Sequence, residues 1–338
     1  MTPEVDLEFP YPVLVCDIGG TNVRIGAVAH PQAALKPVAR LKTGAFPGLA
    51  ECVGHALVGH PDLLPRSMLA CGAGPVAHRR LHLTNARWTI DGPALAERLG
   101  LAQGLLLNDF EAQALALPAH RGEWLHRIGP SSPAEPGPQV ILGPGTGLGV
   151  AALVLSDGRF LPLASEAAHM ELGPSTPEDD EIWPHLDLFH GRITAEAVLS
   201  GPGLVRLHKA RQIAAGMPYD GLDGVGIVTR GLAVADGPEA RTIRHFWRIA
   251  GRFAGNMALT FLAHGGVTLA GGILPRILGL LDENAFRTAF EDKAPLQNVV
   301  RCIETRLLIA PDAVLAGMAA IAAHPDRYMI DYPARAWR

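Results

Sequence analysis

The sequence predicts an α/β protein made of two related halves that face one cleft. Short apolar runs are each followed by a glycine turn, or by polar residues and a helical pattern, which indicates strands that alternate with helices. A strand, a Gly/Thr turn and a second strand occur near residue 17 and again near residue 143, as a weak internal repeat of domain size. The chain has 338 residues, enough for two domains of ordinary size.

The composition is that of a globular protein with a substantial core, because 48% of the residues are hydrophobic and 18% are charged. The net charge is −4 and no basic run stands out, so we do not expect nucleic acid as a partner. No apolar run reaches the roughly 18 residues of a membrane-spanning helix. The acidic start lacks the apolar core of a signal peptide, so we expect no membrane partner. The four cysteines lack CxxC spacing, which favours free thiols in a reducing cytoplasm over disulfides or a zinc site.

The first predicted strand covers residues 13–16 and ends in the turn DIGGTN (17–22), after which apolar and polar residues alternate over residues 23–27. A Walker loop or a dinucleotide fingerprint needs a helix after its glycines, and the pattern here predicts a strand instead. The glycines allow backbone N–H groups to approach a phosphate, and Thr21 adds a hydroxyl donor. Asp17 would repel a phosphate directly, so we expect it to act through a magnesium ion or its water shell. The alternative is a plain β-hairpin that binds nothing.

A predicted helix begins after Asp91, its expected N-cap, with Pro93 in its first turn. Asn85 and Trp88 precede this helix on a loop. A polar group beside an aromatic face suits a sugar. The alternative is an ordinary loop, since exposed Asn and Trp are common without a ligand.

Residues 105–118 read LLLNDFEAQALALP and hold the candidate catalytic base. Residues 105–107 are an apolar strand, and Asn108 and Asp109 follow where that strand passes into a helix that Pro118 ends. In open α/β sheets, ligands bind at this end of the strands. We therefore interpret Asp109 as the base of the reaction. The alternative is that Asp109 is an ordinary N-cap.

The second half repeats the first hairpin, with an apolar strand over residues 140–142, the turn GPGTG (143–147) and a second strand over residues 148–155. Between the halves, residues 129–138 form a Pro/Gly/Ser-rich connector or flap. Two such hairpins, one from each half, could close on a nucleotide from both sides.

Three side chains of the second half are candidate ligands. Glu166 and His169 lie three residues apart and would share one face of a helix. A metal site of the ExxH type uses two copies and further carboxylates, so hydrogen bonding to ligand hydroxyls is preferred, with a structural pair as the alternative. Glu196 adds a carboxylate if its short helix faces the cleft; that helix ends in glycines and resumes at residues 204–213.

Helical spacing of apolar residues predicts a long amphipathic helix over residues 240–264, packed on the core. The Ala-rich residues 314–323 are also expected to be helical. Residues 326–338 are expected to be a surface tail.

Between these helices, a short strand at residues 267–270 ends at Gly271 and Gly272. Two bare glycines at this position allow a flat ligand such as a nucleoside to approach closely. Pro275 then suits the first position of a helix.

These motifs together resemble those of the bacterial glucokinases, in the hexokinase–actin–sugar kinase superfamily. Seven occur in the order of that family: DIGGTN (17–22), LLNDFEAQALALP (106–118), GPGTGLGV (143–150), EAAHMELGP (166–174), EAVLSGPGL (196–204), LAGGILPR (269–276) and AFEDK (289–293). The resemblance covers nearly the whole chain, and seven motifs in order are far more specific than any one alone.

The resemblance implies two actin-like, ribonuclease H-like α/β domains flanking a central cleft. The small domain would comprise residues 1–119 and the returning C-terminal helix at 312–338, and the large domain residues 120–311. The implied reaction is Mg²⁺-dependent phosphoryl transfer from ATP to the 6-hydroxyl of D-glucose, the first step of glycolysis. A cytoplasmic homodimer is also implied.

Matched motif by motif, Asp109 takes the place of the catalytic base, which accepts the proton of the sugar 6-hydroxyl. Sugar-hydroxyl ligands correspond to Asn108, Glu166, His169 and Glu196, with Asn85 as a further candidate. Nucleotide-binding places correspond to Asp17, Gly19, Gly20, Thr21 and Asn22 in the first turn, to Gly143, Gly145, Thr146 and Gly147 in the second, and to Gly271 and Gly272. No side chain is expected to bind the metal directly, since Mg²⁺ would arrive with ATP.

The chain departs from the family pattern at Ala167 and Ala168, which replace two glycines of the usual GEGGH. The loop that carries Glu166 is therefore expected to be stiffer, with an effect on affinity and hexose selectivity. The related ROK sugar kinases carry a cysteine-rich zinc motif, which the cysteines here cannot form.

Other functions remain as alternatives. The closest is a kinase for mannose, fructose or glucosamine. A sugar-sensing regulator is disfavoured because too few residues precede the first strand for a helix-turn-helix segment, and an actin-like ATPase has no need for the sugar ligands. A glycosidase that uses Asp109 and Glu166 would leave both glycine turns without a purpose.

Overall fold

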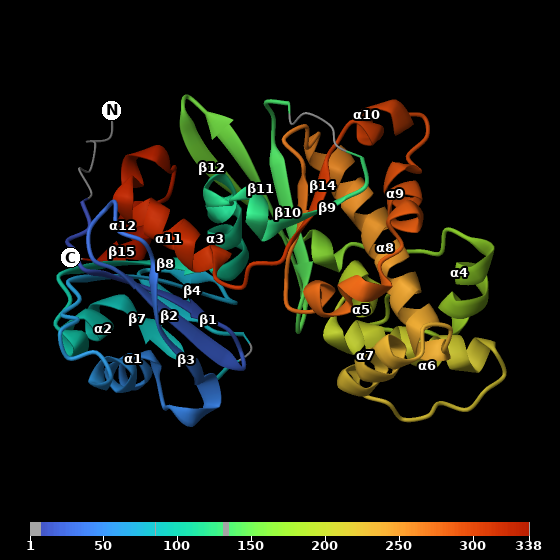
Figure 1. Ribbon diagram of the computed structural model, residues 1–338, viewed down its shortest axis with the longest axis horizontal. Helices are drawn as coiled ribbons and strands as arrows, with labels where there is room; N and C mark the ends of the chain where they lie inside the picture. Colours follow the sequence, from blue (N-terminus) through green and yellow to red (C-terminus); the bar gives the residue numbers. More distant parts are fainter. Residues whose placement is uncertain (1–7, 85, 131–134, 338) are drawn as a thin grey trace. The chain divides into compact units, whose positions relative to one another are not determined.

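The structure is a computed structural model that describes residues 8–84, 86–130 and 135–337. Its elements fall into two compact units (Figure 1). Unit 1 consists of Met1–Gly122, Leu153–Leu163 and Ala310–Arg338, and unit 2 of Glu123–Ala152 and Ala164–Ile309. None of the helices in the described ranges is both long and apolar enough to cross a membrane.

Among the described residues, unit 1 is built on a six-stranded sheet with the order β15-β8-β4-β1-β2-β3. Its strands are β1 (Val13–Ile18), β2 (Asn22–Val28), β3 (Lys36–Lys42), β4 (Ser67–Gly72), β8 (Gln103–Asn108) and β15 (Ala336–Trp337). The neighbours β1, β4 and β8 are parallel, whereas β2 pairs antiparallel with both β1 and β3. The parallel strands therefore end at one edge of the sheet, where β1 passes into the first glycine turn and β8 into a helix. A small separate sheet holds β5 (Val76–Ala77), β6 (Arg80–His82) and β7 (Thr89–Asp91).

Helices cover both faces of the larger sheet of unit 1 (Figure 1). On one face, α1 (Leu49–Val58) and α2 (Gly92–Leu99) pack on alternate residues of β1, among them Leu14, Cys16 and Ile18. On the other face lie α3 (Asp109–Ala116) and α11 (Ala313–Ala323). The predicted start of α2 is confirmed, because the Asp91 side chain accepts a hydrogen bond from the backbone N–H of Ala94 at 3.2 Å.

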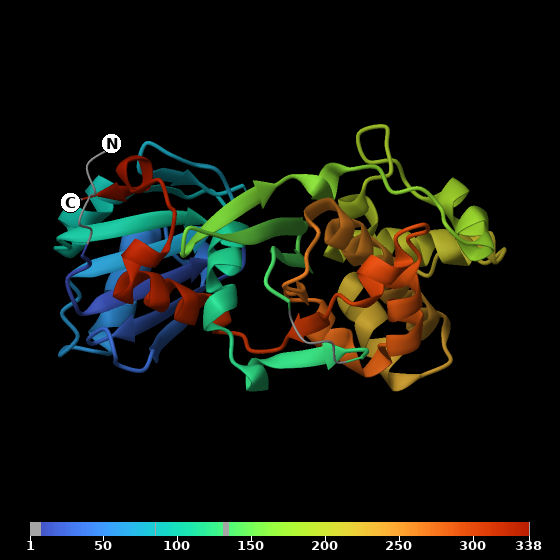
Figure 2. The same cartoon turned by 90° about the horizontal axis from the view of Figure 1, so that it is seen from above.

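The C-terminal residues belong to the fold of unit 1, so the predicted surface tail at residues 326–338 is wrong. After α11 the chain forms α12 (Tyr332–Arg335) and then β15, which pairs antiparallel with β8 (Figure 2). Trp337 is 1% exposed and lies in the core of this unit. A Cβ at Gly104 of β8 would overlap the indole ring of Trp337, so a glycine is needed there to leave room for the ring. Two paired residues show no periodicity, which is why the sequence pattern missed this burial.

Unit 2 contains, in its described part, a second six-stranded sheet with the order β12-β11-β10-β13-β14-β9. Its strands are β9 (Leu125–Ile128), β10 (Gln139–Pro144), β11 (Leu148–Ser156), β12 (Arg159–Ser165), β13 (Val267–Leu269) and β14 (Thr305–Leu308); the outer residues Leu153–Leu163 are grouped with unit 1. The central strands β10, β13 and β14 are parallel. Of the predicted connector at 129–138, residues 131–134 lie outside the described residues, and the rest carries no helix or strand.

The helices of unit 2 are α4 (Pro177–Ile182), α5 (Ala195–Val198), α6 (Gly201–Ala214), α7 (Gly224–Ala233), α8 (Pro238–Phe261), α9 (Glu283–Glu291) and α10 (Gln297–Arg301). The long predicted helix is confirmed as α8, whose apolar stripe is buried. The helix expected to resume at residue 204 begins earlier, because Ser200 caps it by accepting from the Gly203 N–H at 3.0 Å. Pro275 lies in the first turn of a helix as predicted, but that helix is of the 3-10 type (Leu274–Leu280).

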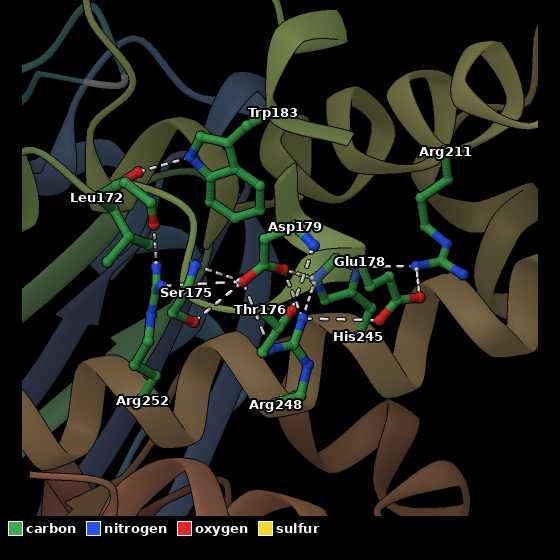
Figure 3. A network of polar contacts seen from close by, with 11 residues as sticks. Leu172, Ser175, Thr176, Glu178, Asp179, Trp183, Arg211, His245, Arg248 and Arg252 are labelled. Atoms are coloured by element: carbon green, nitrogen blue, oxygen red, sulfur yellow. Dashed lines mark hydrogen bonds and ion pairs between the residues drawn. The ribbon is translucent and has the colours of Figure 1, made fainter. Parts of the chain in front are cut away.

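A buried carboxylate, Asp179, ties the short α4 to the long α8 (Figure 3). Its Oδ1 accepts hydrogen bonds from His245 Nε2 at 2.7 Å and from Arg248 Nη2 at 2.5 Å, and its Oδ2 accepts from the N–H and hydroxyl of Ser175, each at 3.0 Å. Burial alone would raise the pKa of Asp179, but the hydrogen bonds from His245 and Arg248 hold that pKa well below its ordinary value. The carboxylate is therefore ionised and fully partnered.

Candidate active site

Asp109 is the first residue of α3 and follows β8 directly. The N-cap of this helix is Asn108, whose Oδ1 accepts from the backbone N–H of Phe110 at 3.0 Å and of Glu111 at 3.2 Å, and whose Nδ2 donates to the carbonyl of Gly74 at 3.1 Å. The interpretation of Asp109 as an ordinary N-cap is therefore wrong. The Asp109 carboxylate accepts one further hydrogen bond, from the Phe110 N–H at 3.0 Å.

The surroundings of Asp109 suit a proton acceptor. Burial raises the pKa of Asp109, and the negative charge of Asp17 raises it further. Hydrogen bonds from the Phe110 N–H and Asn108 oppose this, and the resulting pKa is about 6. A general base works best when its pKa lies near the working pH, so this value fits the role predicted for Asp109.

The first glycine turn lies between β1 and β2, so the predicted order of strand, turn and strand is confirmed. The Gly19 N–H donates to the carbonyl of Asn22 at 2.9 Å and closes the turn. Thr43, after β3, supports it through a hydroxyl that donates to the Gly19 carbonyl at 2.7 Å. At the tip, Gly20 and Thr21 are exposed, so their donors are accessible to a ligand.

β1 continues through Asp17 and Ile18, beyond the predicted end at residue 16, because both pair with β2. Asp17 faces Arg24 across the hairpin, and Arg24 Nε donates to Asp17 Oδ2 at 2.8 Å. The thiol of Cys71 on β4 donates to Asp17 Oδ1 at 3.5 Å. The sequence pattern predicted neither of these two partners of Asp17. The pairing with Arg24 could have been predicted, because residues equally distant from the centre of a hairpin turn face each other. The contact with Cys71 could not, because Cys71 is distant in sequence.

The second glycine turn, residues 143–147, is fixed by its neighbours in unit 2. Within it the Gly145 N–H donates to the carbonyl of Gly147 at 2.7 Å. The Gly145 carbonyl accepts from the Gly201 N–H at the start of α6 at 2.8 Å. The Leu148 N–H donates to Glu196 Oε2 at 2.8 Å. The structure thus brings a predicted sugar ligand together with a predicted phosphate turn.

The glycine pair after β13 packs on the same turn. Gly271 has φ +87°, in the left-handed region that favours glycine, and a Cβ on Gly143 would lie 2.5 Å from the carbonyl carbon of Ala270. At Gly272, a Cβ would meet no heavy atom within 4 Å, so the backbone is open there. The predicted nucleoside and phosphate positions of unit 2 are therefore adjacent.

Glu166 precedes a single 3-10 turn, Ala167–His169, and His169 ends it; Glu166 Oε2 lies 3.6 Å from His169 Nε2. Both side chains are exposed, and the two alanines between them are buried. The segment is joined to α5, because the Ala195 N–H donates to the carbonyl of Met170 at 2.9 Å. Glu196 is the next residue, so the three candidate ligands of unit 2 lie on connected segments.

Asn85, the further sugar candidate, lies outside the described residues. Its neighbour Trp88 is buried, and the indole N–H donates to the carbonyl of Phe46 at 3.1 Å. The aromatic face expected beside a sugar is therefore part of the core of unit 1.

Within the described ranges, His208, Asp220 and Glu239 of unit 2 are the one group of potential metal ligands whose atoms lie within 4.8 Å of one another. Each has a protein partner. His208 Nδ1 lies 2.9 Å from Thr242 Oγ1, His208 Nε2 lies 3.5 Å from Asp220 Oδ2, and Glu239 lies 3.8 Å from Arg230. We interpret this group as a polar cluster between α6 and α8.

Comparison with known proteins gives consistent matches over the length of the chain. A family model described as Glucokinase matches residues 14–325. The glucokinase of Sinorhizobium medicae is 39% identical over 333 residues, which cover 98% of each chain. A solved glucokinase from an Antarctic psychrotroph has a TM-score of 0.82 at 29% identity, covering 93% of this chain and 99% of that one. A ROK family glucokinase from Streptomyces griseus, solved with glucose and AMPPNP, shares the fold with a TM-score of 0.60 at 20% identity, covering 92% and 99%.

Proposed function

This chain belongs to the glucokinase family, and on that premise we propose which of its residues transfer a phosphoryl group from ATP to the 6-hydroxyl of D-glucose. The enzyme is an ATP-dependent hexose kinase with the α/β, actin-like fold of the sugar kinases. The observation that supports the residue assignment best is Asp109 at the end of β8, with a pKa of about 6 and the capping role already taken by Asn108.

Asp109 is the general base of this proposal. It accepts the proton of the sugar 6-hydroxyl as that oxygen forms its bond to the γ-phosphorus of ATP and the bond to the β-phosphate oxygen breaks. Phosphoryl transfer needs little covalent chemistry from the protein, so holding the hydroxyl and the phosphate in line supplies most of the acceleration.

The remaining hydroxyls of glucose are held by Asn108, Glu166, His169 and Glu196, with Asn85 as a further candidate. The exposure of Glu166 and His169 supports this role, because their polar atoms are accessible to a ligand. A sugar that lacks one of these hydroxyls would leave one of these polar groups without its partner in the complex, which disfavours its binding.

ATP is held by the two glycine turns and the glycine pair. The exposed Gly20 and Thr21 and the turn of residues 143–147 would offer donors to the phosphates, and the open backbone at Gly272 would offer a surface to the nucleoside. Mg²⁺ bound together with ATP would supply positive charge that offsets the charge of the phosphates. Asp17 would reach the water shell of that ion and not the ion itself.

Three further properties belong to this proposal. The enzyme catalyses the first step of glycolysis, acts in the cytoplasm where its free thiols stay reduced, and forms a homodimer. Light scattering of the purified protein measures the last of these, and a monomer at micromolar concentration would contradict it.

A coupled assay of ADP release over glucose, mannose, fructose and glucosamine tests the activity and its substrate. We expect the highest kcat/KM for glucose with ATP as donor. A higher value for another hexose would reassign the enzyme to that sugar, and turnover with polyphosphate but not ATP would reassign the donor.

A further inference from the structure

The carboxylate of Asp17 is held between a guanidinium and a thiol. Arg24 donates to Oδ2, with its Nε at 2.8 Å, and Cys71 Sγ donates to Oδ1 at 3.5 Å. The Asp17 side chain is 16% exposed and that of Arg24 is 25% exposed, so the ion pair is largely shielded from water. A shielded pair interacts more strongly than a pair at the surface.

Strand geometry explains why these three side chains meet. Asp17 lies opposite Arg24 in the antiparallel β1–β2 pair and opposite Cys71 in the parallel β1–β4 pair. The adjacent residues Cys16 and Ile25 point into the core beneath α1 and α2. Side chains alternate along a strand, so Asp17, Arg24 and Cys71 share the other face, on which α3 packs with the candidate base as its first residue.

Strand register places Asp109 near this group, because Ile18, next to Asp17, pairs with Gly72 of β4, and Gly72 pairs with Asn108, next to Asp109. After burial, the charge of Asp17 is the main cause of the raised pKa of Asp109. Burial also raises the pKa of the Cys71 thiol, and the charges of Asp17 and Asp109 raise it further, so the thiol is neutral and near both carboxylates.

Two other carboxylates on the neighbouring elements have cationic partners. Asp312, which precedes α11, lies 3.9 Å from Arg24. On α3, Glu111 accepts a hydrogen bond from Arg335 of α12. Arg24 is therefore the cation that compensates Asp17.

We propose that Arg24 is a positioning residue for phosphoryl transfer: it fixes the Asp17 carboxylate in place and offsets the negative charge that Asp17 presents to Asp109. The inference rests on the proposed function, in which Asp109 is the base. Without Arg24, the full charge of Asp17 acts on Asp109, which then keeps its proton to higher pH and accepts the substrate proton less readily at neutral pH.

The test is the pH profile of kcat/KM for glucose at saturating ATP in Arg24→Gln. We expect the acid limb to move to higher pH by roughly 0.5 to 1.5 units, a size typical of the effect of one nearby charge in a partly shielded site. Arg24→Lys retains the charge and should keep the limb near its wild-type position. Arg40→Gln is the matched control, because Arg40 pairs with Arg24 one strand further out and is exposed, so removing its charge should leave the limb in place.

An acid limb that stays in place in a folded Arg24→Gln protein would overturn the inference, even if kcat falls. If Arg24→Gln does not fold, as judged by circular dichroism, Asp17→Asn provides the second measurement. Removal of the Asp17 charge should move the limb to lower pH, and an unchanged limb would again refute the inference.

Failure of the proposed function would look different. If Asp109→Asn retained turnover, Asp109 would not be the base, whatever the pH profile of the Arg24 variants. An inactive Asp109→Asn together with an unmoved limb in Arg24→Gln would refute this inference alone.

Discussion

The backbone N–H of Leu148 donates a hydrogen bond to Glu196 Oε2 at 2.8 Å. Leu148 is the first residue of β11 and directly follows the proposed phosphate turn, and Glu196 is a proposed ligand of the sugar. A Cβ on Gly147 would lie 2.5 Å from the same carboxylate oxygen, so only a glycine leaves room for it. In unit 2, one carboxylate therefore links the sugar candidates to the turn that would hold the phosphates.

Glu196→Ala should raise the KM for both glucose and ATP. It removes a sugar ligand and also the acceptor that anchors the turn, and the loss of a partner for a buried N–H costs about 1–3 kcal/mol, or roughly tenfold or more in affinity. Gly147→Ala should change both constants in the same direction by displacing the carboxylate. Steady-state kinetics with each substrate varied in turn provides the measurement.

Gly173→Ala is the control for this pair, since a Cβ at Gly173 meets no heavy atom within 4 Å. A rise in the KM for glucose alone in Glu196→Ala would show that Glu196 does not support the phosphate turn.

Asp109→Asn should lower kcat by at least ~10²-fold, the lower end of the contribution of a general base. The amide keeps the size and the hydrogen bond from the Phe110 N–H, so glucose should still bind with nearly unchanged affinity. Single-turnover kinetics and calorimetric titration separate the two quantities. Asp62→Asn, at an exposed position of the same unit, should leave both unchanged. Near-wild-type turnover of Asp109→Asn would exclude the assigned role.

The activity should fall on acidification with a midpoint near the pKa of Asp109, which is about 6. The base must be deprotonated to act, so kcat/KM for glucose should rise with pH through this midpoint and level off above it. An Asp with an ordinary pKa of about 3.9 would place the acid limb some two units lower. A profile that stays flat down to pH 5 would contradict the assignment.

Local pattern predicted the elements that carry the candidate chemistry. Both glycine hairpins, the passage from β8 into α3 and the stripe of α8 depend on residues close in sequence, where strand and helix periods are visible. Contacts between distant segments could not be predicted. The thiol of Cys71 beside Asp17 and the indole of Trp337 between α2 and β8 depend on strand order, which one sequence does not encode in its periodicity.

Asp179→Asn should destabilise the protein by about 3–5 kcal/mol at pH 7, because it leaves His245 and Arg248 without their buried carboxylate. The matched variant is Asp187→Asn, whose exposed pair with Lys209 is worth at most about 1 kcal/mol. Urea unfolding of both variants gives the comparison. The pKa of Asp179 in the folded protein lies below its ordinary value, so this stabilisation is present above about pH 4 and is lost as the pH falls further. The difference in unfolding free energy between Asp179→Asn and wild type should therefore shrink below about pH 4. Equal losses in the two variants would contradict the buried network.

Trp337→Ala should cost about 3–5 kcal/mol of unfolding free energy, because it leaves a cavity where the indole packs against Gly92 and Gly104. Within the described residues the indole N–H has no hydrogen-bond partner, so Trp337→Phe should cost less, losing volume but no hydrogen bond. Met329→Ala, at a residue 38% exposed in the same C-terminal segment, is the control and should stay within about 0.5 kcal/mol of wild type. β15 is only two residues long, so its strand pairing contributes little, and we expect the aromatic side chain to contribute most to holding the C-terminus on β8. A loss below 1 kcal/mol in Trp337→Ala, measured by urea unfolding, would contradict this anchoring role of Trp337.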